Sequence, residues 1–142
     1  MMVCLQVVVS FQLSEAAEPV ADQKRLPRLK PTEIDQVLDT FEVKEGFDLE
    51  LVAAEPLVVD PVAMDFDALG RAFVVEMIGY SERRPERLGR VRMLVDEDQD
   101  GDFDRSEIFA KDLPWPTAVI CYDGGVFVGA TPDIFYLKDS DR

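Results

Sequence analysis

The sequence predicts an all-β fold, a partial β-propeller of about two blades of antiparallel strands with a short N-terminal helix. Short runs of alternating apolar and polar residues recur along the chain. Turn signals such as Asp123-Gly124-Gly125 separate them at intervals of about ten residues. A strand followed by Asp-x-Asp occurs at Asp96 and again at Asp139, and the offset of about 43 residues is typical of one propeller blade.

The N-terminal residues are predicted to lie outside this domain. Residues 1–17 form a signal-like segment, because an apolar run precedes Ser14-Glu15-Ala16-Ala17, although no Lys or Arg stands before the run. The run is too short to span a bilayer. Residues 18–31 carry three prolines among mixed charges and are interpreted as a linker. The partial propeller is therefore expected over residues 32–142.

A helix of about nine residues is predicted to follow the linker. Thr32 is a suitable N-cap, and Ile34, Val37, Leu38 and Phe41 share one helical face. Because so short a helix is not stable alone, its apolar face is expected to pack against a sheet.

The strand predictions rest on period-two alternation. Phe47 and Leu49 are expected on the buried side of one strand, and Met64 and Phe66 on the buried side of the next. The expected strands cover residues 47–53, 62–66, 71–76, 90–95, 108–110, 118–122, 126–130 and 134–138. Turns at residues 67–70 and 123–125 close two hairpins.

Composition excludes several classes of function. The chain has no histidine, which removes the usual general base and the commonest metal ligand, and no catalytic residue is predicted. Cys4 and Cys121 are too few for a zinc site, no haem-attachment motif is present, and Cys121 is expected to be a buried, inert thiol. The net charge of −14 would repel a phosphate backbone, so nucleic acid is not expected as a partner.

Seven of the twelve residues 96–107 are acidic. Calcium takes six to eight oxygen ligands, and a twelve-residue loop can supply them from positions 1, 3, 5, 7, 9 and 12 with glycine at position 6. Gly101 stands at the glycine position. The ligand positions are occupied by Asp96, Asp98, Asp100, Asp102, Asp104 and Glu107. This match predicts a Ca²⁺ site joining two strands.

Two other interpretations of the loop stay open. Paired EF-hand helices are not favoured, because a strand precedes the loop and Pro114 follows it closely. A solvated acidic connection without an ion is the other alternative. Two unit charges 4 Å apart repel by about 1 kcal/mol even in water, so crowded carboxylates favour a bound cation.

Several motifs in one order resemble a known family. They are Gly46-Phe47 with Glu50-Leu51-Val52-Ala53-Ala54-Glu55-Pro56, then Phe66-Asp67 with Gly70-Arg71, Glu76-Met77, Gly89-Arg90-Val91, the acidic loop, Leu113-Pro114 and Pro132-Asp133-Ile134. Residues 32–142 resemble the N-terminal part of the β-propeller domain in bacterial putative membrane-bound dehydrogenases, similar to glucose and sorbosone dehydrogenase propellers.

The resemblance implies a propeller related to enzymes that oxidise sugars with a quinone cofactor (PQQ). Such oxidation needs a histidine base and cationic residues from later blades, which this chain lacks. The resemblance also places Glu76 at the end of an inner strand, either facing a central funnel or facing solvent.

Three hypotheses follow. The first is a calcium-binding fragment of a dehydrogenase-like propeller without activity of its own. The second is part of a sugar or alcohol oxidoreductase site, completed by further blades or a second chain. The third is a non-enzymatic exported interaction module that presents strand edges and Trp115. The signal-like segment favours a periplasmic or extracellular location, with the cytoplasm as the alternative.

Overall fold

The computed structural model describes residues 29–139. The chain divides into two units, Met1–Thr32 and Glu33–Arg142, and the strands found in residues 29–139 belong to the second unit. The signal-like segment 1–17 lies outside the described residues, as does the predicted linker apart from residues 29–31.

The second unit is all-β, and residues 29–139 contain no α-helix. Its strands are β1 (Pro61–Phe66), β2 (Ala72–Glu76), β3 (Gly89–Val95), β4 (Arg105–Leu113), β5 (Pro116–Tyr122), β6 (Gly125–Ala130) and β7 (Asp133–Lys138). Both predicted hairpins are confirmed, as are the strands expected at residues 90–95 and 134–138. The short strand expected at residues 108–110 is the middle of the longer β4.

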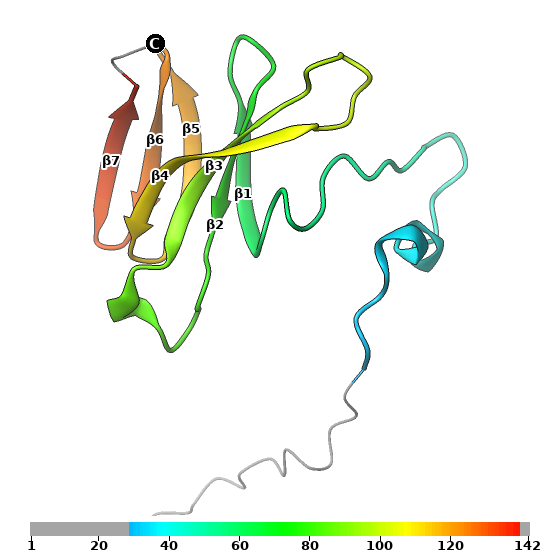
Figure 1. Ribbon diagram of the computed structural model, residues 1–142, viewed down its shortest axis with the longest axis horizontal. Helices are drawn as coiled ribbons and strands as arrows, with labels where there is room; N and C mark the ends of the chain where they lie inside the picture. Colours follow the sequence, from blue (N-terminus) through cyan, green and yellow to red (C-terminus); the bar gives the residue numbers. More distant parts are fainter. Residues whose placement is uncertain (1–28, 140–142) are drawn as a thin grey trace, which may run out of the picture. The chain divides into compact units, whose positions relative to one another are not determined.

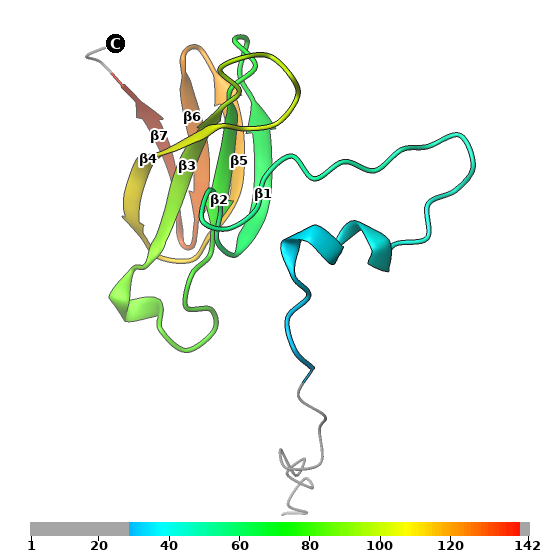
Figure 2. The ribbon, with the colours of Figure 1, turned by 45° about the vertical axis from the view of Figure 1, so that its right-hand side comes forward.

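The strands form two antiparallel sheets (Figures 1 and 2). The first sheet has the order β1-β2-β3-β4, and the second has the order β5-β6-β7. Within each sheet, strands that are consecutive in the sequence pair with each other, as expected for antiparallel neighbours. The link between the two sheets is short, because β4 ends at Leu113 and β5 begins at Pro116.

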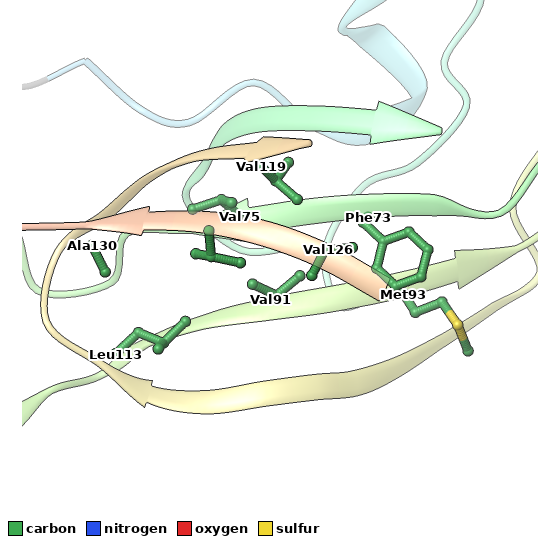
Figure 3. Close-up of a cluster of buried hydrophobic side chains, with 9 residues drawn as sticks. Phe73, Val75, Val91, Met93, Leu113, Val119, Val126 and Ala130 are labelled. Carbon is green, nitrogen blue, oxygen red and sulfur yellow. The ribbon is translucent and has the colours of Figure 1, made fainter. Parts of the chain in front are cut away.

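The core lies between the inner faces of the two sheets. Figure 3 shows the side chains that fill this layer, among them Phe73 and Val91 from the first sheet and Val119 and Val126 from the second. Each fully buried side chain of this size contributes roughly 1.5–3 kcal/mol. A polar contact joins the same layers, since the Cys121 amide donates to Asp65 Oδ2 at 2.7 Å.

The outer face of the first sheet has a second, smaller cluster. Ala72, Val74 and Leu94 are buried there, and Ala53, Val58 and Phe103 pack against them. Residues 52–59, here called the strap, therefore cover part of this face without forming a strand. Because both faces of β2 are covered, all five of its residues are buried.

The predicted N-terminal helix is wrong. The chain forms two three-residue 3₁₀ turns, Ile34–Gln36 and Leu38–Thr40, with no buried residue in either. Ile34, Leu38 and Phe41 are exposed rather than packed against a sheet. A segment this short gains too few hydrogen bonds to propagate an α-helix without tertiary contacts.

Two strand predictions also need correction. Residues 47–53 have the period-two pattern but form no strand, because no neighbouring strand supplies hydrogen-bond partners within the described residues. In β1 the expected orientation is reversed. Met64 and Phe66 are exposed on the outer side, while Ala63 and Asp65 face the core and β5.

Candidate metal centre in the β3–β4 hairpin

The acidic loop connects β3 and β4 at one end of the first sheet. Val95 pairs with Arg105 across the hairpin, so residues 96–104 form the connection. The Asp104 amide donates to the Val95 carbonyl at 3.1 Å and closes the base of the loop. The loop is therefore positioned by an antiparallel ladder, which is in regular register from Arg92 to Val95, and not by flanking helices.

Backbone amides hold several of the loop carboxylates. Asp96 accepts from the Gln99 amide at 2.6 Å and from the Gly101 amide at 3.1 Å. Gln99 and Gly101 both have positive φ, which lets the chain turn around the Asp96 carboxylate. On the other side of the loop, Asp104 Oδ2 accepts from the Glu97 amide at 2.7 Å.

Three of the six predicted ligands come together. One carboxylate oxygen from each of Asp96, Asp98 and Asp104 lies within 4.8 Å of the other two. Calcium–oxygen distances are about 2.3–2.6 Å, so two ligands of one ion can be up to about 5 Å apart. Asp96 is half-buried, while Asp98 and Asp104 are exposed. The spacing suits a single hard cation bound at the surface.

The electrostatics of the loop also favour a cation. The charge of Asp100 raises the pKa of Asp98, and burial and the charges of Asp104 and Asp96 add to this, against a backbone hydrogen bond that lowers it. A carboxyl group whose pKa is raised by its neighbours is one that repels them when ionised. A divalent cation in the cluster would reverse the sign of this interaction.

The other predicted ligands lie outside the three-residue group. Asp100 accepts from the Asp102 amide at 2.9 Å within the loop. Glu107 belongs to β4, where Arg105 Nη1 donates to it, and Arg105 Nε donates to Glu97 at 2.7 Å. In the structure the twelfth loop position is thus part of an ion-pair network next to the cluster.

Phe103 connects the loop to the rest of the molecule. Its amide donates to the Val52 carbonyl at 3.0 Å, and its ring packs against the cluster on the outer face of the first sheet. Because Phe103 precedes Asp104, the carboxylate cluster and the strap are adjacent parts of one structure. The loop pattern assigned no role to Phe103, whose contacts with Val52 and the outer cluster are far away in the sequence.

Comparison with protein families gives one assignment. The family described as Domain of unknown function (DUF7133) matches residues 33–142, which is most of the chain. The chain belongs to this family. No curated protein and no solved structure matches it. The matched range covers all the strands of the DUF7133 domain and the whole acidic loop.

Sequence reasoning missed a buried ion-pair cluster in the DUF7133 domain. Glu76, considered as a funnel-facing or solvent-facing residue, has no exposed surface. Arg90 Nε donates to one of its oxygens, and Arg92 Nε donates to the other at 3.0 Å. The Val59 amide donates to the same carboxylate at 2.7 Å, so Glu76 also fixes the end of the strap. The solvent-facing interpretation is therefore wrong. In the sequence, the alternating arginines Arg90 and Arg92 on the next strand indicate a charged row, but not its partner.

The remaining candidate residues do not form a reactive site. Burial, followed by the charge of Asp65, raises the pKa of the half-buried Cys121 thiol to about 11, so it stays protonated at neutral pH. Trp115 is partly buried, with Tyr80 at its edge and the Arg84 guanidinium over its ring. Within residues 29–139, no helix has the length and apolar character required to cross a bilayer.

Proposed function

We propose that this chain is a calcium-binding structural module without catalytic activity of its own. The observation that carries the proposal is the convergence of Asp96, Asp98 and Asp104 in a hairpin loop. The absence of histidine from the whole sequence supports a structural rather than a catalytic use of the site.

The three converging carboxylates form the centre of the proposed coordination. Asp100 and the Asp102 carbonyl are close in sequence and would bring the protein ligands to five, so water or a bidentate carboxylate would supply the rest of the six to eight oxygens that calcium takes. Glu107 is the least favoured of the predicted ligands, because binding calcium would require it to leave Arg105. Asp104, at the ninth position of the loop, is therefore the last protein ligand of the proposed site.

Calcium bound there has a structural role. It cancels the repulsion that raises the pKa of Asp98, and it fixes Asp104 next to Phe103. Phe103 in turn holds the strap through Val52 and covers the outer face of the first sheet. The ion thus stabilises the contact between the β3–β4 hairpin and the strap. A single unpaired loop is expected to bind weakly, at about 10⁻⁴–10⁻³ M, which suits an exported protein in millimolar calcium.

We further propose that the two sheets are blades of a dehydrogenase-like propeller. The ordered motifs between Gly46 and Ile134, and two antiparallel sheets of four and three strands, support this origin. In that setting further blades or a second chain would complete the propeller. An oxidoreductase role, with PQQ as cofactor, is the alternative, and it predicts sugar-dependent reduction of a redox dye only when further blades or a second chain are co-expressed.

Thermal unfolding with chelator and then with calcium tests the structural role. Calcium at ten times its dissociation constant stabilises the folded state by about 1.4 kcal/mol. For a domain of this size, that corresponds to a rise in midpoint of roughly 5–10 °C. Magnesium at the same concentration is the control and should give a smaller rise. Equal midpoints in chelator and in calcium would contradict the proposal.

A further inference from the structure

The outer face of the second sheet is apolar and uncovered. Its large side chains are Ile134, Tyr122, Ile120, Tyr136 and Phe127, whose exposed fractions are 78%, 65%, 62%, 42% and 40%. Such a continuous apolar patch on adjacent strands is typical of an interaction surface. The strap and Phe103 cover the corresponding face of the first sheet, and within the described residues the second sheet has no equivalent cover.

The strand register arranges this face in three rows. The central row is Ile120, Phe127 and Tyr136, which are directly paired across β5, β6 and β7. The row on one side is Tyr122, Gly125 and Lys138. The row on the other side is Ala118, Gly129 and Ile134. No carboxylate occurs among these nine positions, although the whole chain has a net charge of −14.

The aromatic part of the face is held in place. Phe127 lies between Tyr122 and Tyr136, with ring centroids 6.1 and 4.8 Å away. The Tyr136 hydroxyl reaches the carbonyls of Tyr122 and Asp123 at 3.1 and 3.2 Å, and its ring occupies the space that a side chain at Gly125 would need. A surface ordered in this way loses little conformational entropy when it binds.

We propose that this face pairs with the same face of a second copy of the chain around a two-fold axis along the central row. Ile120, Phe127 and Tyr136 then each meet their own counterpart. The two outer rows exchange, so the large Tyr122 lies over the small Ala118 of the partner copy and Lys138 lies over Ile134. A large side chain of one copy thus packs against a small residue of the other. Gly125 makes no contact with the partner, because the Tyr136 ring of its own chain covers it.

The size and charge of the face favour this occupant. The five large side chains expose on the order of 600 Å², close to the roughly 800 Å² per partner of a stable interface. Two copies that each carry a charge of −14 can approach here because none of the nine face positions is acidic, and the adjacent Asp123 carboxylate is paired with Lys138 at 3.5 Å. Pairing of identical faces also closes the assembly at two copies. This inference does not depend on calcium binding. It competes with the proposal of further propeller blades, because a following blade would pack on this same face.

Size-exclusion chromatography with light scattering, on the full chain from about 1 to 100 µM, tests the pairing in chelator and in calcium. The wild type is expected to form a dimer. Ile120→Glu and Phe127→Glu place like charges opposite each other on the axis and should shift the dissociation constant at least 100-fold. Leu69→Glu, at an exposed site in the β1–β2 turn, is the control and should leave the dimer intact.

Ile134→Glu tests the register, because it places a carboxylate opposite Lys138 of the partner copy. It should keep or strengthen the dimer, whereas Ile120→Glu on the same face should abolish it. Circular dichroism verifies that each variant keeps its β-sheet signal. A monomeric wild type, a larger or open-ended assembly, or a dimer that survives both Ile120→Glu and Phe127→Glu would overturn the proposal.

Discussion

The outer faces of the two sheets differ in what covers them. The first sheet has the strap, the Phe103 ring and a buried carboxylate that bonds to two arginines. The second sheet presents an aromatic and aliphatic surface to solvent. Phe103 is the part of the acidic loop that packs on the covered face, and its amide donates to the Val52 carbonyl of the strap. Stability is therefore expected to respond unequally to changes on the two faces.

The largest loss of folding stability is expected when Glu76 is replaced. Replacing it with alanine leaves Arg90 and Arg92 without their shared carboxylate and releases the Val59 amide. Removing one partner of a buried ion pair costs roughly 3–5 kcal/mol, a large part of the stability of a small domain. The measurement is the free energy of unfolding in urea.

A matched carboxylate provides the control for Glu76. Glu86 pairs with Arg83 on the exposed 84–86 turn, and Glu86→Ala should leave the urea midpoint almost unchanged. Equal effects of Glu76→Ala and Glu86→Ala would show that the cluster does not hold the first sheet and the strap together.

A smaller difference in stability is expected between the alanine variants of two phenylalanines, one on each outer face. Phe103→Ala removes half-buried apolar surface from the first sheet and should cost about 1–2 kcal/mol. Phe127→Ala, on the uncovered face, should cost less than about 1 kcal/mol at concentrations where the chain is monomeric. Thermal unfolding of both variants at low micromolar protein is the measurement. A larger loss for Phe127→Ala would contradict the comparison.

The smallest difference in stability is expected between two substitutions in hairpin turns, Asp67→Asn in the first sheet and Asp123→Asn in the second. Burial raises the pKa of Asp67, but hydrogen bonds from the Arg71 side chain and from the amides of Arg71 and Leu69 outweigh it, so the pKa is lowered. A lowered folded-state pKa contributes stability above the unfolded value, and this stability is lost as the pH falls through the folded value. Asp67→Asn should therefore cost about 1 kcal/mol at pH 7.

The pH dependence separates this charge effect from a general packing defect. The difference in free energy of unfolding between the wild type and Asp67→Asn, measured in urea, should become smaller as the pH falls below about 4. In the second sheet, Asp123 is an exposed turn residue with only a 3.5 Å ion pair to Lys138, so Asp123→Asn should change little. A gap for Asp67→Asn that is constant from pH 7 to pH 3 would contradict the assignment.

The hairpins could be predicted from sequence because their signals are local. Asp67 to Gly70 and Asp123 to Gly125 identify the turns, and the alternation beside them sets the strands. Residues 47–53 carry the same alternation, but a strand also needs a neighbour, and none of the described strands pairs with it. The orientation of β1 was predicted wrongly because Asp65 accepts from the Cys121 amide, 56 residues away.

In the candidate site too, features set by local sequence could be predicted, and those that depend on distant contacts could not. The spacing of Asp96, Asp98 and Asp104 was sufficient to select residues that the fold brings together. The environment of Glu107 was not predictable from the loop pattern, since it depends on Arg105 in the β4 ladder. Glu76 was missed as a buried residue because its arginine partners lie on a different strand, and pairing register is not visible in a single sequence.

Isothermal titration of calcium into the wild type, Asp104→Ala and Glu107→Gln tests the central claim most directly. We expect one site in the wild type, loss of binding in Asp104→Ala, and affinity within a few-fold of wild type in Glu107→Gln. Wild-type binding should weaken as the pH is lowered through the raised pKa of Asp98, because protons then compete with the ion. Heat no greater than that of dilution in the wild type would contradict the account.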